Sequence, residues 1–111
     1  MKIKEIAGIL EAELFCGEAM LDCEISSVCA TDLMSDVIAF LRDGPALVTG
    51  LIDNQVIHTA DMMDINCVIF VRGKKPGLSV TEQARAKNIA YMTTALSMYA
   101  SCGKLYSAGL R

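Results

Sequence analysis

The stretch Cys67-Val68-Ile69-Phe70-Val71 is the most informative part of this chain, because it is a continuous apolar run between polar residues. A strand covered by helices on both faces has such a continuous run, whereas a half-exposed strand alternates apolar and polar residues. Asp64-Ile65-Asn66 precedes the run, and the basic loop Arg72–Gly77 follows it. The run therefore predicts a central strand of a parallel sheet.

Three further apolar runs lie on either side of it along the chain, at Ile25–Ala30, Ala46–Val48 and Ile89–Met92. Each of the four runs is followed by a stretch with helical spacing, which is typical of a parallel sheet with helices on both faces. Ala12–Cys16 alternates, and it predicts either a strand paired with the next one or an extension of the sheet edge. We therefore expect one α/β domain over residues 1–111, with a mostly parallel sheet of about five strands.

Apolar spacing also predicts one apolar face for each of four helices. The four sets are Ile3, Ile6, Ala7 and Leu10; Leu33, Val37, Ile38 and Leu41; Val56, Ile57, Ala60 and Met63; and Leu96, Tyr99, Cys102 and Tyr106. Polar residues predict where helices begin. The expected caps are Thr31 or Asp32, Asp53 or Asn54, the capping box from Ser79 to Glu82, and Thr93 or Thr94. Asp43-Gly44-Pro45 and Gly109 are expected to stop helices.

Composition and charge argue against several classes of protein. The net charge is −3 and the ten basic residues are scattered, so we expect no nucleic-acid partner. The opening MKIKEIAGIL is amphipathic and unlike a signal peptide, and no run has membrane-spanning length, so we expect a cytoplasmic protein without a membrane partner. An apolar fraction of 53% in so small a domain favours a homodimer, with a dense methionine-containing core as the alternative.

The cysteines predict neither a disulfide framework nor a metal site. They are odd in number and form no C-x-x-C pair: Cys16, Cys23, Cys29, Cys67 and Cys102. The gaps of six and five residues between the first three match no zinc or ferredoxin spacing. We expect reduced, mostly buried thiols, and neither a metal nor another cofactor.

Polar residues follow the four apolar runs, and the carboxyl ends of parallel strands meet at one edge of a sheet. Hydroxyls and helix N-termini at that edge suit a small anion or phosphate, with charge supplied by Arg72, Lys74 or Lys75. Ordinary caps and turns explain the same residues without a ligand. The candidate ligand-binding residues are Thr31, Asp32, Ser35, Asp36, Thr49, Arg72, Lys74 and Thr93.

No catalytic residue is assigned from the sequence. The phosphate-binding loop, the dinucleotide fingerprint, the zinc-protease motif and the nucleophile elbow are all missing, and His58 is the single histidine. Asp32 and Asp36 are four residues apart in an expected helix, so they could hold a divalent cation or serve as acid and base. A small metal-dependent enzyme using these two residues is the alternative to a non-catalytic protein.

Four stretches together resemble the DRTGG domain family. They are KIKEIAGIL at 2–10, LDCEISSVCATDLMSDVIAFL at 21–41, CVIFVRGKKP at 67–76 and the helix after MTT at 92–94. The segment from Thr31 to Val37 is the most specific, being similar to S-D-L-L-S-D-V of that family. Ser26-Ser27-Val28 stand near the position of the family's glycine pair.

This resemblance implies an α/β domain like the N-terminal domain of bacterial HPr kinase. DRTGG domains also accompany phosphotransacetylase domains and, with CBS domains, certain pyrophosphatases, which implies a regulatory or dimerising module. The family has no agreed catalytic residues, and the phosphate-binding loop of HPr kinase belongs to another domain. We therefore expect a non-catalytic, homodimeric regulatory or protein-interaction module, which in one form of the hypothesis senses a small anionic metabolite or nucleotide.

Overall fold

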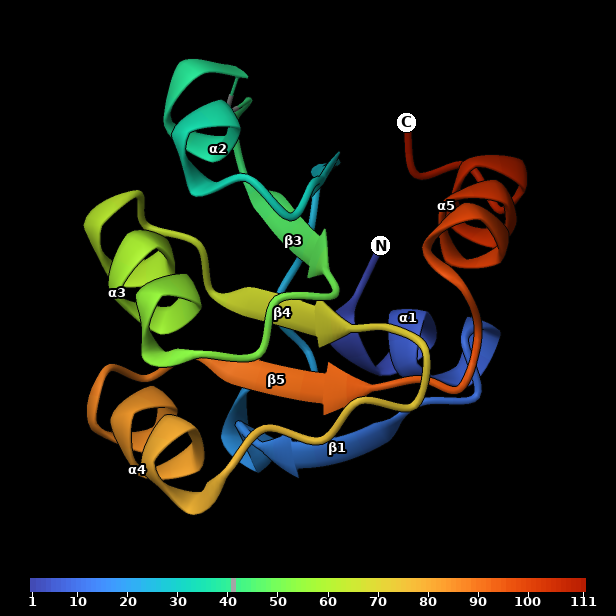
Figure 1. Ribbon diagram of the computed structural model, residues 1–111. Coiled ribbons are helices and arrows are strands. Elements are labelled where there is room, and N and C mark those ends of the chain that lie inside the picture. Colours follow the sequence, from blue (N-terminus) through green and yellow to red (C-terminus); the bar gives the residue numbers. More distant parts are fainter. Residues whose placement is uncertain (41) are drawn as a thin grey trace.

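The computed structural model describes residues 1–40 and 42–111, and Figure 1 shows how its elements are arranged. In chain order these are α1 (Ile3–Ile9), β1 (Glu13–Cys16), the 3-10 helix η1 (Glu18–Met20), β2 (Ser27–Ala30), α2 (Met34–Phe40), β3 (Pro45–Thr49), α3 (Asn54–Met62), β4 (Cys67–Phe70), α4 (Leu78–Ala86), β5 (Ala90–Thr93) and α5 (Met98–Ser107). Leu41, which the sequence places on an apolar helix face, lies outside the described residues.

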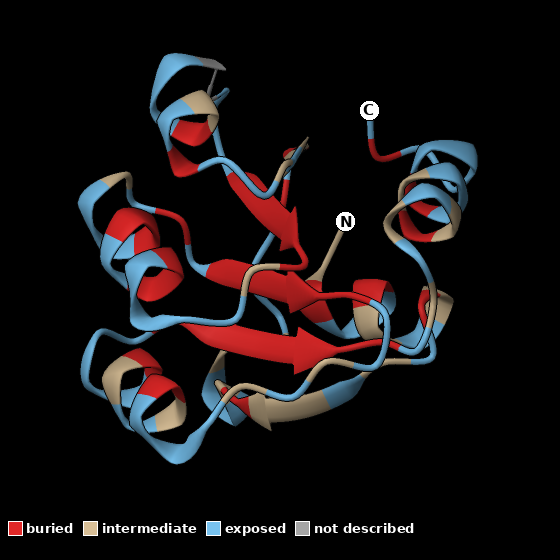
Figure 2. Ribbon diagram, viewed as in Figure 1, coloured by how far each residue is buried: buried red, intermediate tan, exposed pale blue. Residues whose placement is uncertain are grey.

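The five strands form one sheet in the order β1-β5-β4-β3-β2. Strands β2 to β5 run parallel, and β1 is antiparallel to β5. β4 is the middle strand, and all of its residues are buried (Figure 2). The predicted α/β class, the mostly parallel sheet and the central position of the Cys67–Phe70 strand are therefore confirmed.

Helices cover both faces of the sheet, with α2, α3 and α4 on one face and α1 and α5 on the other (Figure 1). Side chains alternate between the two faces along each strand, so Val68 packs in the core on the α2–α4 side and Ile69 in the core on the α1–α5 side. Burial on both faces explains why the strand sequences are continuously apolar. No helix within the described ranges is long and apolar enough to cross a membrane.

β1 extends the sheet edge beside β5, and it does not pair with the next strand in the chain. Glu13 pairs with Thr93 and Leu14 with Met92, and the register then shifts before Cys16. The chain next passes through η1 to the opposite edge, where β2 begins. The edge extension is confirmed, and the alternative of a strand pair is wrong.

The predicted apolar faces are confirmed for two helices. In α1 the side chains of Ile3 and Ile6 are fully buried, as are those of Val56, Ile57 and Ala60 in α3. These faces lie against the sheet, as their spacing predicts.

The other two predicted faces lie partly at the surface. In α2 Met34 and Val37 are buried, whereas Ile38 and the preceding Leu33 are at least half exposed. In α5 the small Ser101 and Leu105 are turned to the core, which leaves Tyr99 90% and Tyr106 61% exposed. Periodicity identifies a stripe of side chains, but neighbouring elements decide which stripe is buried.

The helix caps differ from the predictions more than the apolar helix faces do. Asp53 caps α3 by accepting a hydrogen bond from Gln55 N at 3.0 Å, as expected. α4 is capped by Gly77 instead of Ser79, whose hydroxyl donates to Asn54 Oδ1. α5 is capped by Ser97, and Gly109 in the left-handed region follows its end as predicted.

The threonines expected to cap the last helix do not do so, because α5 starts further along the chain. Thr94 Oγ1 donates to Leu10 O at 2.7 Å and accepts from Leu96 N, which ties the end of β5 to the end of α1. Thr93 is the last residue of β5 and is buried. The prediction of a Thr93 or Thr94 cap is therefore wrong.

Candidate functional site

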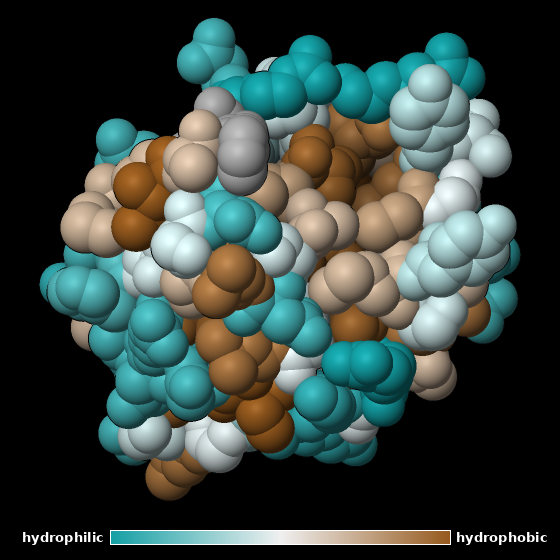
Figure 3. Space-filling model, turned by 45° about the horizontal axis from the view of Figure 1, so that its top comes forward, coloured by the Kyte–Doolittle hydropathy of each residue, from teal (hydrophilic) through white to brown (hydrophobic). Residues whose placement is uncertain are grey.

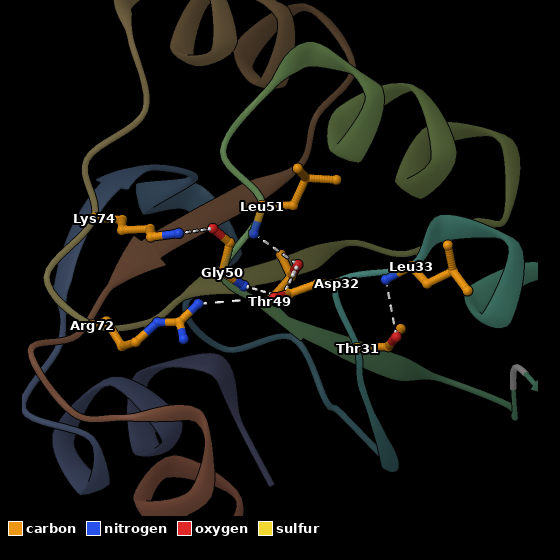
Figure 4. Close-up of polar contacts among 8 residues, drawn as sticks. All are labelled: Thr31, Asp32, Leu33, Thr49, Gly50, Leu51, Arg72 and Lys74. Atoms are coloured by element: carbon orange, nitrogen blue, oxygen red, sulfur yellow. Dashed lines mark hydrogen bonds and ion pairs between the residues drawn. The ribbon is translucent and has the colours of Figure 1, made fainter.

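A polar cluster lies at the carboxyl ends of three neighbouring strands (Figure 4). Asp32 follows β2, Thr49 ends β3 and Gly50 follows it, and Arg72 and Lys74 follow β4. Because these strands are parallel, residues from different strand ends, at least 17 positions apart in the chain, meet at one edge. The structure thus brings together four of the eight predicted residues, namely Asp32, Thr49, Arg72 and Lys74.

The Asp32 carboxylate connects the ends of β2 and β3. Its Oδ1 accepts a hydrogen bond from Gly50 N at 2.7 Å and another from Thr49 Oγ1 at 3.2 Å. Thr49 is buried, and its hydroxyl also accepts from Leu51 N. These contacts fix the direction of the carboxylate, and they show that Asp32 does not cap α2, which begins only at Met34.

Arg72 lies above Gly50 and faces the same carboxylate. Its backbone has a positive φ of 60° and its N–H donates to Leu96 O at 2.8 Å, so the loop around it is held in place. Its Nη2 lies 3.8 Å from Asp32 Oδ2, and about half of the side chain remains exposed. A Cβ at Gly50 would lie 2.4 Å from Arg72 Nη2, so only glycine leaves room for the guanidinium in this position.

Lys74 completes the cluster from the other side of Gly50. Its Nζ donates to Gly50 O at 2.8 Å. Gly50 therefore binds Asp32 through its N–H and Lys74 through its carbonyl, and it is the one residue of the site that the predicted set leaves out. The sequence feature that could have identified Gly50 is its position directly after Thr49, at the end of an expected strand.

The remaining predicted residues take no part in this network of contacts. Thr31 Oγ1 accepts from Leu33 N in a local turn. Ser35 and Asp36 lie on α2, and Thr93 is buried at the end of β5. Burial first, and the Asp36 carboxylate second, raise the pKa of Cys29, which places Asp36 near β2.

The expected helical pairing of Asp32 with Asp36 is wrong, since Asp32 precedes α2 and its carboxylate points toward the end of β3 (Figure 4). No group of three or more histidine, cysteine or acidic residues is placed to hold a metal ion in the part of the chain that the structure describes.

All five cysteines are free. Burial raises the pKa of Cys16, Cys29 and Cys102, and it raises the pKa of fully buried Cys67 to about 12. A raised pKa keeps a thiol protonated at neutral pH, as expected for cysteines that serve as small apolar residues. Cys23 differs from that expectation, because it is exposed.

The serines near the position of the family's glycine pair lie far from the polar cluster along β2. Ser26 N donates to Gly44 O at 2.8 Å, and Ser27 Oγ donates to Asp43 O at 2.9 Å. These contacts are at the amino end of β2, whereas Asp32 follows its carboxyl end. Ser26 and Ser27 therefore bind the turn before β3, at the opposite end of β2 from Asp32.

No protein-family model matches the sequence, and no characterised protein matches it in sequence. Among solved structures, the fold is similar to the crystal structure of the CBS and DRTGG domains of the regulatory region of Clostridium perfringens pyrophosphatase, complexed with its activator diadenosine tetraphosphate. The TM-score is 0.77 at 17% sequence identity, and the match covers 94% of this chain but 45% of that one. This chain therefore has the fold of a part of that regulatory region, which supports the DRTGG-like fold expected from its sequence.

Proposed function

We propose that this chain is a non-catalytic, homodimeric regulatory module of the DRTGG kind, which binds a small anionic ligand such as a nucleotide at the carboxyl edge of its sheet. The observation that carries the proposal is the position of two cationic side chains, Arg72 and Lys74, over Gly50 at the end of β3. The likeness in fold to a regulatory region bound to a nucleotide activator supports it.

The cluster has unused donors for an anion. A guanidinium carries five N–H donors, and Arg72 faces Asp32 with one nitrogen while half of its side chain is exposed. An ammonium carries three donors, and Lys74 uses one of them on Gly50 O. The remaining donors suit phosphate oxygens, which both side chains bind well.

The proposal gives Asp32 a positioning role and no catalytic one. Gly50 N–H and the Thr49 hydroxyl already bind its Oδ1, so this oxygen is not a free base. Its other oxygen faces Arg72. Asp32 thereby holds the guanidinium above Gly50, at the place where a ligand would be bound.

Isothermal titration calorimetry with diadenosine tetraphosphate, ATP and inorganic phosphate tests this proposal. We expect at least one of the nucleotides to bind, and Arg72→Ala or Lys74→Ala to weaken binding by about ten-fold or more, since a hydrogen bond to a charged group contributes about 1.5–3 kcal/mol. Lys75→Ala is the matched control, because Lys75 is an exposed cation of the same loop and its loss should change the Kd less than about two-fold.

Thermal unfolding of the same variants separates loss of binding from loss of folding. Each variant should unfold near the wild-type temperature without ligand, and a nucleotide at about 100 times its Kd should stabilise the wild-type protein by about 2.7 kcal/mol. The proposal is wrong if none of these compounds binds, or if Lys75→Ala impairs binding as much as Arg72→Ala does.

A further inference from the structure

The two edges of the sheet differ in how they are protected. Natural proteins guard exposed strand edges with charges, prolines, bulges or covering groups. β1 has such protection, because Glu13 is charged, the register shifts before Cys16, and Arg85 donates to Phe15 O at 3.1 Å. β2, Ser27-Val28-Cys29-Ala30, has neither a charge nor a proline, and within the described residues it pairs with β3 alone.

The unpaired backbone groups of β2 belong to Val28 and Ala30. Thr31 N donates to Val48 O of the neighbouring strand, and alternate residues of a strand point to the same neighbour. Cys29 and Thr31 therefore face β3, while the N–H and C=O groups of Val28 and Ala30 point outward. Both outward residues are accessible, since Val28 is partly exposed and Ala30 is exposed.

An apolar groove of about 180 Å³ lies directly beside this edge, between β2 and α5. Its lining includes Val28, Ala30, Leu105 and Leu110. A second hollow on the outer surface of α5 shares Cys102 and Tyr106 with the groove and reaches Tyr99. Figure 3 shows this side of the molecule hollowed, with apolar residues gathered in the hollow and hydrophilic ones along its upper border.

The area of this surface suits a dimer. Tyr99 and Tyr106 are 90% and 61% exposed, so together they present roughly 300 Å² per copy, given about 150–250 Å² for each aromatic side chain. Two copies would bury roughly 600 Å² through these side chains, against the roughly 1,000 Å² in total that a stable interface needs. The strand edge and the groove would have to supply the remaining 200 Å² or so per copy.

We propose that a second copy of this chain binds the surface formed by the β2 edge and the outer face of α5, which we call the β2–α5 surface. The two β2 strands would pair antiparallel about a two-fold axis, so that Val28 of one copy exchanges hydrogen bonds with the partner's Ala30. This register uses both outward residues of each strand and joins the two sheets into one. The inference rests on the homodimer proposed above and names its surface.

Sedimentation equilibrium of wild-type protein and three variants tests the surface. Ala30→Pro removes an outward N–H without removing a hydrogen bond within the chain, and Tyr106→Glu places a charge beside the groove. Each should weaken dimerisation by at least about 30-fold, as loss of a central contact does. Leu78→Glu is the control, because Leu78 is 74% exposed on the opposite helical layer, and this variant should remain dimeric.

Cross-linking tests the register. With Val28 opposite the partner's Ala30, the two copies of Cys29 face each other at a Cα separation of about 4.5 Å, within the range that a disulfide spans. In a Cys23→Ser, Cys102→Ser background, copper-phenanthroline as oxidant should give a covalent dimer of twice 12.0 kDa on a non-reducing gel. Adding Cys29→Ser should abolish it.

These outcomes separate this inference from the proposed function. A monomeric wild-type protein would overturn both the surface and the homodimer. A dimer that persists in Ala30→Pro and in Tyr106→Glu, with both variants folded by circular dichroism, would overturn the β2–α5 surface alone. Nucleotide binding is measured independently by calorimetry, so failure of the ligand site leaves the dimer tests intact.

Discussion

At the scale of single residues, Gly50 has the tightest steric requirement in the candidate site. A Cβ there would lie 2.4 Å from Arg72 Nη2, which is the mobile end of a long side chain. We predict that Gly50→Ala displaces the guanidinium, weakens nucleotide binding about ten-fold, and changes the free energy of unfolding by less than about 1 kcal/mol. Calorimetry and urea unfolding measure both quantities.

The control for this substitution is Gly8→Ala. A Cβ at Gly8 meets nothing within 4 Å, and Gly8 lies inside α1. Alanine there should stabilise the protein by about 0.5–1 kcal/mol without affecting binding. Unchanged affinity in Gly50→Ala would show that Arg72 does not bind the ligand.

We predict that ionisation of the buried Cys67 thiol lowers the stability of the protein at alkaline pH. Burial raises its pKa from 9.0 to about 12, so the folded protein keeps the proton where the unfolded chain loses it. The stabilising contribution is complete below pH 9 and should fall by about 1.4 kcal/mol per pH unit between pH 9 and 12. Urea unfolding under reducing conditions should show a shallower loss in Cys67→Ala than in the wild-type protein, and equal slopes would contradict this assignment.

Strand-end logic predicted Asp32, Thr49, Arg72 and Lys74 because it needs only the order of strands along the chain. The same argument also selected Thr31 and Thr93, which lie at strand ends but outside the network of contacts around Gly50. Asp36 was selected by its spacing from Asp32 in an expected helix, whereas Asp32 precedes α2. The Asp32 carboxylate binds Gly50 and Thr49, and no local sequence pattern encodes a hydrogen bond between the ends of two strands.

At the scale of elements, the helix caps give the clearest test of the structure against the sequence pattern. Ser97 Oγ accepts from Ala100 N at 3.1 Å, so Ser97→Ala should cost about 1 kcal/mol. Ser79 belongs to a capping-box pattern but caps no helix, so Ser79→Ala should cost less than about 0.5 kcal/mol. Urea unfolding measures the loss of stability in each variant. A larger loss in Ser79→Ala than in Ser97→Ala would contradict the cap of α4 described above.

Strands were easier to predict than helix faces for a physical reason. A strand buried on both faces needs apolar residues at every position, and this leaves a pattern independent of its neighbours. Which face of a helix is buried depends on the elements that pack against it. In α5 Ser101 and Leu105 lie against the core, whereas the predicted apolar stripe that includes Tyr99 lies partly at the surface. The same choice leaves the β2–α5 surface exposed.

At the scale of the whole molecule, net charge and local charge oppose each other. The chain carries a net charge of −3, yet the proposed site presents Arg72 and Lys74. Contacts within the site act over shorter distances than the overall repulsion, so they should dominate binding. We predict that raising NaCl from about 50 to about 500 mM weakens nucleotide binding in calorimetry. Stronger binding at high salt would mean that repulsion by the whole molecule outweighs the basic loop.

The central claim is that the carboxyl edge of the sheet around Gly50 binds an anionic ligand. Titration of ¹⁵N-labelled protein with diadenosine tetraphosphate, followed by two-dimensional NMR, tests this most directly, because each backbone amide reports its own surroundings. The account predicts saturable shifts in the amides of Gly50 and of residues 72–75, and smaller shifts in α4 and α1. Shifts confined to other parts of the chain, or none at millimolar ligand, would contradict it.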